Sequence, residues 1–516
     1  MQTEVLIVGA GPTGLALACQ LVRFGIDFVI IDKNASTTEH SKAIGVHART
    51  LEIYEQIGLA DQLIAAGAKA EMVRLIEGGK IRGEVYLGKI GEGMSPYPFL
   101  LLVEQGKHER IVYDHIVANG GEVKWETEMT GFEQSGDGIS ATIRSSDGAL
   151  QTIEAKYLVG CDGAGSFVRH SLGLGFGGST FERHFYVADV EIVSQFSHDS
   201  LYICLSEHTI TAFFPMRGSD RNFRIVGTFP EGHDKDPTEV LYEEIEKQIS
   251  ADTELELDIT KVNWFSVYKV HSRHVERFSS GRCFLAGDSA HIHTPAGAQG
   301  MNTGIQDSYN LAWKLSAVLR QNAKKTLLES YDAERLANAK RLLRTTDRMF
   351  NLGASDDILL GFFRTKIFPH VADFLINLDV VQRAIFPLIS QIGINYRESE
   401  LSRGSRDFEY KPGDRMPYFE VEGESIFDIL REPKFHIVVF HDGRRMISEF
   451  GNEFASIADL HLLHLHLEAA HVFGAAEDFT LVVRPDNYIG MIAPGADMSD
   501  VREYFASVFS EYGSAF

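Results

Sequence analysis

Residues 4–14 read EVLIVGAGPTG, a short apolar run that leads into a glycine-rich turn. The apolar residues 4–8 are typical of a buried strand, and residues 13–24 have the spacing of a helix that ends at Gly25. A second apolar run, residues 28–31, ends in Asp32. Together these segments predict a βαβ unit.

The three glycines of this turn have separate physical tasks. In such a motif the first glycine permits a tight turn, the second lets the backbone approach a pyrophosphate, and the third lets the helix pack on the strand. An acid about 20 residues later accepts a hydrogen bond from a ribose hydroxyl. We therefore predict a dinucleotide site. The alternative is an ordinary glycine-rich turn between strand and helix. The residues predicted to form it are Gly9, Gly11, Pro12, Thr13, Gly14, Asp32 and Lys33.

Length and composition limit the possibilities further. The chain has 516 residues, which is enough for about two to four domains. It is 44% hydrophobic and 23% charged, as globular proteins are. Its formal net charge of −23 argues against a nucleic-acid partner, because phosphate neutralisation needs clustered lysines and arginines. An anionic cofactor must therefore be held by local backbone N–H groups and a few basic side chains.

Several further classes are disfavoured. The N-terminus lacks a basic segment before its first apolar run, and no stretch reaches the roughly 20 apolar residues of a membrane span, so we expect a cytoplasmic protein. The cysteines lie far apart, which predicts reduced thiols rather than disulfides. They are Cys19, Cys161, Cys204 and Cys283.

Two later segments end a predicted buried strand in a carboxylate beside glycine. Residues 158–166 read LVGCDGAGS, and residues 282–291 read RCFLAGDSAH. Residues 295–302, PAGAQGMN, then lead into a predicted helix over 302–319. With these motifs in this order, residues 3–345 resemble the flavoprotein aromatic hydroxylases, the class A monooxygenases that include p-hydroxybenzoate hydroxylase and phenol hydroxylase.

The resemblance implies an FAD site and the residues that form it. Asp288 would hydrogen-bond the ribityl hydroxyls, with a helix N-cap as the alternative role, and the Asp162-Gly163 pair would serve FAD and the nicotinamide cofactor unless it is a plain turn. The backbone near Pro295 would contact the peroxide, as the one catalytic candidate. The residues implied to bind the cofactor are Arg49, Gln105, Asp162, Gly163, Gly287, Asp288, Pro295, Gly297, Gly300, Met301 and Asn302. Glu109 would accompany Gln105 at the start of a helix.

We expect an α/β fold with four segments. Residues 1–180 and 269–400 would form a Rossmann-like FAD-binding domain with a helical region, and residues 181–268 an inserted antiparallel β-sheet substrate domain. Residues 405–516 are similar to the thioredoxin-like α/β domain of many family members. That segment has no cysteine, so it would serve packing, oligomerisation or folding rather than redox exchange.

The expected activity is that of an FAD-dependent monooxygenase. By resemblance, NADPH or NADH would reduce the flavin, and a C4a-hydroperoxide formed with O₂ would hydroxylate a small aromatic substrate, phenolic or polycyclic. Epoxidation, Baeyer–Villiger oxidation and antibiotic inactivation stay open, as does a non-catalytic structural flavoprotein, and a homodimer is possible. Related phenol hydroxylases often carry Asp where this chain has Ile44, which favours a larger or already activated substrate.

Some residues invite other interpretations. His291 and His293 sit inside the flavin motif, where loop packing is favoured over metal binding. A second group, His461, His464, His466 and His471, falls on a predicted helix, where only the first two have the spacing of neighbours. We predict no metal site. Phe213 and Phe214 are candidates for lining the substrate pocket, although core packing would also account for them.

Overall fold

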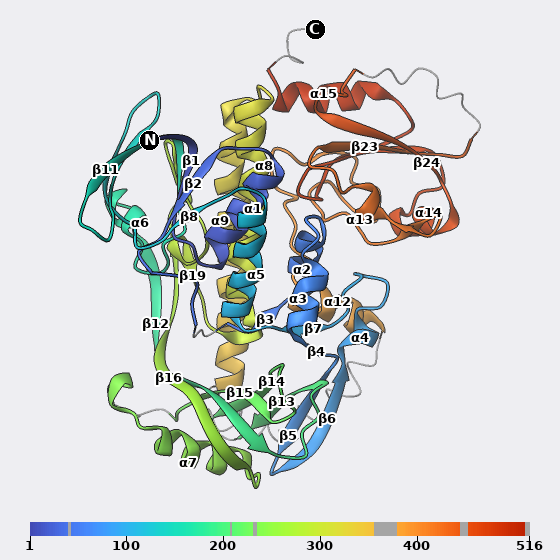
Figure 1. Ribbon diagram of the computed structural model, residues 1–516. Helices are drawn as coiled ribbons and strands as arrows, with labels where there is room; N and C mark the ends of the chain where they lie inside the picture. Colours follow the sequence, from blue (N-terminus) through green and yellow to red (C-terminus); the bar gives the residue numbers. More distant parts are fainter. Residues whose placement is uncertain (40–42, 207–208, 231–234, 355–378, 444–452, 511–516) are drawn as a thin grey trace.

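The computed structural model describes residues 1–39, 43–206, 209–230, 235–354, 379–443 and 453–510 (Figure 1). Three large sheets organise this part of the chain. One contains the first βαβ unit, the second lies at the bottom of the view in Figure 1, and the third belongs to the C-terminal part. The mixture of sheets and covering helices confirms an α/β fold.

The first sheet is built around the apolar run at the N-terminus. Its strand order is β17-β18-β11-β1-β2-β8, and the neighbouring pairs from β18 to β8 are parallel, with β9 and β10 added beside β11. The bounds are β1 Gln2–Val8, β2 Phe28–Ile31, β8 Val123–Lys124, β9 Glu128–Gln134, β10 Ile139–Arg144, β11 Leu150–Gly160, β17 Ser279–Ser280 and β18 Cys283–Leu285. Strand β1 is almost wholly buried, as a central parallel strand should be.

Helices α1, Pro12–Arg23, and α8, Gly300–Arg320, pack against each other beside this sheet. Helix α8 is buried around most of its circumference, so it forms an internal axis rather than a surface helix. The other main helices are α2 Ala48–Glu55, α3 Ala60–Ala66, α4 Leu87–Ile90, α5 Gln105–Ala118, α6 Phe167–Ser171, α9 Glu329–Ala354 and α12 Asp379–Ile389. The predicted helix over 302–319 is confirmed.

The second sheet has the order β19-β16-β12-β15-β14-β13-β5-β6. All its pairs are antiparallel except β5 with β13. The bounds are β5 Met72–Glu77, β6 Lys80–Tyr86, β12 Phe176–Val193, β13 Ser200–Leu205, β14 Ile210–Pro215, β15 Asn222–Thr228, β16 Asp258–Val275 and β19 His291–Ile292. The long strands β12 and β16 connect it to the first sheet (Figure 1). The hairpin β5–β6 joins this sheet although it precedes residue 181, where we expected the sheet to begin.

Helix α7, Tyr242–Thr253, covers one face of this sheet. Phe213 is fully buried in the core between sheet and helix, so it does not line a pocket. Its neighbour Phe214 points to the other face, because side chains alternate along a strand, and packs beside Ile44 and Met216. Of these two phenylalanines, only Phe214 lies on the face of the sheet opposite helix α7.

The C-terminal sheet has the order β20-β26-β25-β23-β24, in which β23 is parallel to β24 and antiparallel to β25. Its strands are β20 Arg403–Gly404, β23 Phe435–His441, β24 Ala458–His464, β25 Phe479–Val483 and β26 Ile489–Pro494, and its helices are α13 Ile426–Ile429, α14 Leu467–Phe473 and α15 Met498–Val508. His461 and His464 lie on strand β24, so the predicted helix was wrong for these two, whereas His471 lies on α14. Strand β24 forms the edge of the sheet, and its exposed and half-buried residues alternate.

Smaller elements complete the fold. Strands β3 Gly45–Val46, β4 Ala68–Ala70 and β7 Leu100–Leu102 make a short sheet, and β21 Glu420–Val421 pairs with β22 Glu424–Ser425. Single turns of 3₁₀ helix include η2 Gly287–Ser289 and η3 Ala296–Ala298. Within the described residues, no helix is both long enough and apolar enough to cross a bilayer.

Candidate active site

A cleft with a volume of about 320 Å³ opens at the carboxyl ends of β1 and β2. Ligands of such sheets bind at this edge, because the turns that leave parallel strands converge there. Seven predicted site residues line the cleft: Gly9, Gly11, Asp32, Lys33, Gln105, Asp162 and Gly163. Sequence motifs more than 150 residues apart are thus brought together in one place.

The glycines of the first turn have the geometry that their three tasks require. Gly9 has φ +104°, a value that favours glycine, and an added Cβ would meet the Cys161 carbonyl at 2.3 Å. At Gly14 an added Cβ would lie 1.9 Å from the Gly9 carbonyl oxygen, so this glycine lets helix pack on turn. Gly11 has no protein atom within 4 Å of that position. The space above Gly11 is therefore open to a ligand.

The N-terminus of α1 faces this opening. Gly11 precedes the helix and Pro12 begins it, a residue that suits the first turn because its missing N–H would have no acceptor there. The first turn contains no acidic side chain. Free N–H groups and the positive end of the helix dipole favour an anion at this point.

Asp32 closes one side of the cleft. Its carboxylate accepts hydrogen bonds from the backbone N–H groups of Ala10, at 2.7 Å, and Asn34, at 2.8 Å. These bonds fix the acid at the rim and couple the glycine turn to the end of β2. An oxygen of an ionised carboxylate accepts more than one bond, so Asp32 keeps capacity for a ribose hydroxyl.

Gln105 and Glu109 line the opposite side of the cleft, in the N-terminal part of α5. Gln105 donates to Glu109 at 2.8 Å, and Glu109 also accepts the backbone N–H of Thr38 at 2.8 Å. Burial, together with the nearby charge of Asp32, raises the pKa of Glu109. The pair joins residues 36–38 to the helix and shapes this wall.

Asp162 lines the cleft but also serves the local fold. Its carboxylate accepts from the hydroxyls of Ser166 and Ser289, at 2.5 and 3.0 Å, and from the Val168 backbone at 3.1 Å. The acid thus caps the short helix α6 and ties it to Ser289, which follows the Gly287-Asp288 pair, called the GD motif below. Gly163 follows with φ +79°, where a glycine is favoured.

Asp288 presents a different picture. Within the described residues its carboxylate has no hydrogen-bond donor, and the side chain is accessible to solvent. An N-cap role would require a bond to a nearby backbone N–H, which is absent among the described residues. A free acid beside a glycine-rich loop fits the hydroxyls of a bound ligand.

The loop after Asp288 leads to the N-terminus of α8. Gly297 is exposed with φ +76°, and the partly buried Pro295 accepts the Ala298 N–H at 3.0 Å. In the described chain the N–H groups of Gly300, Met301 and Asn302 have no protein acceptor, as expected in a first helical turn. These groups form a second anion-favouring surface.

Asn302 is a predicted ligand whose side chain the protein itself occupies. It accepts from His47 and Thr50, at 2.9 and 2.7 Å, and donates to the Gly45 and Ala298 carbonyls, both at 2.9 Å. Its amide therefore clamps α2 to α8, leaving only its backbone N–H for a ligand.

Arg49 is not brought together with the cleft residues. It is fully buried, donates to Glu52 at 3.1 Å and to the Asp486 carbonyl at 2.8 Å, and lies over the rings of Tyr309 and Tyr488. These contacts place it between α2 and the C-terminal part of the chain.

Sequence reasoning missed the side chains that hold the GD motif. Asp307 on α8 accepts the Gly287 N–H at 2.9 Å and the His291 ring N–H at 2.8 Å. Arg335 on α9 donates to the other oxygen of Asp307 at 2.6 Å. Burial opposes the charge of Asp307, but Arg335 and His291 together keep its pKa below the usual value. Polar residues on otherwise apolar α8 were the signal that could have found them.

Comparison with known proteins identifies the family of the chain. The family described as an FAD binding domain matches residues 2–346, about two thirds of the chain. A curated flavin-dependent monooxygenase of Mycobacteroides abscessus is 31% identical over 98% of this chain and 99% of its own length. The chain belongs to the FAD-dependent monooxygenases.

Two further relatives are similar to the monooxygenase over most of its length. The 6-methylpretetramide 4-monooxygenase of Streptomyces rimosus is 33% identical over 78% of this chain and 72% of its own. Among solved structures, the anhydrotetracycline hydroxylase of Streptomyces rimosus superposes with a TM-score of 0.78 and 28% identity, covering 99% of each chain. The cofactor is FAD, and NAD(P)H is the usual reductant of this class.

Proposed function

We propose that the monooxygenase hydroxylates a polycyclic phenolic substrate with electrons from NAD(P)H and one oxygen atom from O₂. The observation that carries the substrate class is the environment of Ile44. This residue is buried in an apolar cluster with Leu201, Phe214 and Met216 of the second sheet. Phe214 and Met216 are only partly buried and would offer an apolar surface to a wide ring system, while Ile44 provides no acid to deprotonate a simple phenol.

The residues of the site divide the work of holding FAD. The open space above Gly11 and the N-terminus of α1 would take the pyrophosphate, Asp32 the adenosine ribose, and Asp288 the ribityl chain. The N-terminus of α8 would face the most electron-rich edge of the ring system and favour negative charge there. FAD, when bound, supplies the electron transfer and the activation of O₂.

The protein then orients the substrate and excludes water. We propose residues 181–268, together with the hairpin β5–β6, as the substrate domain, and the backbone at Pro295 as the part of the loop nearest the reacting atoms. We further propose that the C-terminal sheet of residues 405–516 is thioredoxin-like, in view of its central β23–β25 pairs and flanking helices. Asp162 and Gln105 belong to the cofactor wall in this scheme.

The test is the anaerobic rate of flavin bleaching by NADPH or NADH, with single-ring phenols compared with phenols of three or four fused rings. We expect acceleration by a polycyclic member only. That compound is then turned over under ¹⁸O₂, and its product should gain one labelled oxygen. A product with ring expansion or an epoxide would assign the alternative oxidations. Flavin that stays oxidised with every reductant and ligand would leave a structural flavoprotein.

A further inference from the structure

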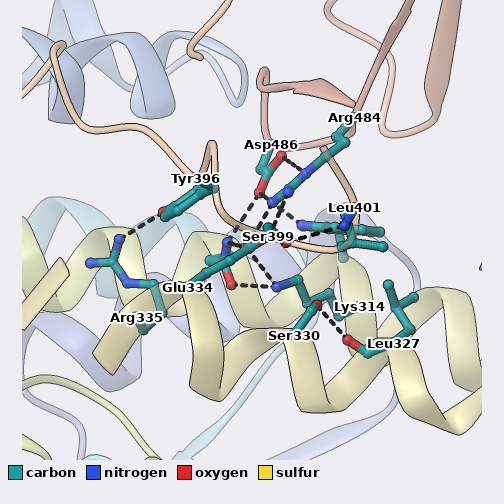
Figure 2. Close-up of polar contacts among 12 residues, drawn as sticks. Lys314, Leu327, Ser330, Glu334, Arg335, Tyr396, Ser399, Leu401, Arg484 and Asp486 are labelled. Carbon is teal, nitrogen blue, oxygen red and sulfur yellow. Dashed lines mark hydrogen bonds and ion pairs between the residues drawn. The ribbon is translucent and has the colours of Figure 1, made fainter. Parts of the chain in front are cut away.

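A buried ionic cluster joins the C-terminal part of the chain to helices α8 and α9 (Figure 2). Arg484 donates to both oxygens of Glu334, at 2.7 and 3.0 Å, and to both oxygens of Asp486, at 2.9 and 2.5 Å. Lys314 donates to Glu334 at 2.8 Å. All four side chains are buried, so each charge depends on the others.

The next residue along α9, Arg335, is buried and contacts the side chain that holds the Gly287 backbone. Arg335 donates to Asp307, which in turn holds the Gly287 N–H and the His291 ring. Gly287 is the residue immediately before the free acid Asp288. Arg335 is therefore linked through Asp307 to the loop that presents Asp288.

Tyr396 connects the two groups. Its hydroxyl accepts the other arm of Arg335 at 2.7 Å, and its ring lies 5.3 Å from the Arg484 guanidinium and 4.4 Å from the Tyr488 ring. Figure 2 shows Tyr396 reaching Arg335 from the segment that precedes the C-terminal sheet. Residues of the turn 484–488 therefore pack against Tyr396, which holds Arg335 by a hydrogen bond.

A second route leads from the same turn to the other side of the site. The Asp486 carbonyl accepts Arg49, and Arg415 donates to Glu52 at 3.2 Å, so α2 is held at two points. At the start of α2, the His47 backbone donates to Asn302, and its ring lies 3.1 Å from the Ala298 carbonyl. Contacts from the C-terminal part of the chain therefore reach the N-terminus of α8 by two routes, one through Arg335 and the other through α2.

We propose that the C-terminal turn 484–488 positions the cofactor loop 287–302, with Arg335 and Tyr396 as its positioning residues. The FAD-binding family matches only residues 2–346. The proposal therefore gives a role in cofactor binding to residues outside that match. The inference depends on FAD binding and not on the substrate or the reaction proposed above.

The test measures the loaded protein without substrate. Tyr396→Phe removes only the hydroxyl that accepts the hydrogen bond from Arg335. Arg484→Lys keeps the positive charge but loses the bidentate hydrogen bonds to Glu334. We expect FAD to dissociate about tenfold faster from either variant, because a charged hydrogen bond that orders the loop is lost. The flavin midpoint potential should shift as well.

Arg397→Met is the matched control, since Arg397 lies next to Tyr396 in sequence but pairs with Asp414, at 2.6 Å, on a partly exposed surface. It should leave FAD release and the potential unchanged. If Tyr396→Phe and Arg484→Lys lower only the melting temperature, or if the control releases FAD as fast as they do, the proposal is overturned. Should Arg484→Lys fail to fold, Tyr396→Phe decides alone.

Discussion

The proposed cofactor site and the C-terminal junction use polar groups in opposite ways. At the cofactor site, Asp288 and the N–H groups at the start of α8 lack protein partners among the described residues. At the junction, Arg484, Glu334 and Asp486 are saturated by one another in a buried cluster. Groups left unpaired at an accessible surface await a ligand, whereas groups paired inside the protein hold its parts together.

The largest effect should come from breaking the junction. Glu334→Ala removes the common partner of Lys314 and Arg484 and leaves two buried cations with one acid, Asp486. Losing one partner of a buried ionic cluster costs about 3–5 kcal/mol in the free energy of unfolding. Urea unfolding followed by circular dichroism measures it. Glu128→Ala, which breaks an exposed pair with Arg144, is the control and should change little.

The cleft should respond to a change that leaves the fold intact. Gly11→Val fills the open space above the turn, so we expect FAD affinity to fall about 100-fold, or ~2.7 kcal/mol, while the apoprotein melts as before. Gly14→Val drives a side chain into the Gly9 carbonyl and should destabilise the apoprotein itself. FAD titration and apoprotein melting separate the two. Equal losses of apoprotein stability would contradict the assignment of Gly11 to the ligand.

Acidification should weaken both regions. Burial lowers the pKa of His108, on α5, to about 4 and that of His436, on β23, to about 3. Their stabilising contribution is complete above the unfolded value near 6.5 and is lost as pH falls toward the folded values. Each should cost about 2 kcal/mol between pH 7 and pH 5. His436→Gln should flatten the dependence by that amount, and an unchanged slope would show that His436 is not neutral in the fold.

The smallest effect should come from an exposed pair in the C-terminal part. Arg502 lies 3.1 Å from Glu453, and the two side chains are 45% and 43% exposed. Arg502→Ala should cost about 0.5 kcal/mol at low salt and nothing measurable at 1 M salt. A larger loss of stability in thermal melting that does not depend on salt would contradict the expected difference between buried and exposed charges.

Most of the cleft could be predicted from the sequence because its motifs are local. Gly9, Gly11 and Asp32 belong to one βαβ unit, whose geometry follows from strand, turn and helix in succession. The GD motif and the helix over 302–319 were found in the same way. For Asp288, the preference for a ligand over an N-cap rested on the flanking glycine-rich loop, since a free carboxylate is visible only in the folded chain.

The junction was beyond such reasoning. Glu334 and Arg484 are separated by 150 residues, and charges on a helix are ordinarily interpreted as a solvated face. Arg49 matched a cofactor pattern in its register yet lies against Asp486. His461 and His464 were assigned to a helix because their spacing fits helical neighbours, although they lie on strand β24. Long-range pairing decided each case.

The pairing of Glu334 with Arg484 also bears on how the chain is synthesised. At about 5–20 residues per second, Arg484 leaves the ribosome roughly 8–30 s after Glu334. For that interval Glu334 on helix α9 can pair with Lys314 but still lacks the guanidinium that contacts both of its oxygens. Nascent chains arrested before residue 484 should therefore be recognised by chaperones, even though every motif that we propose to contact FAD has already been made.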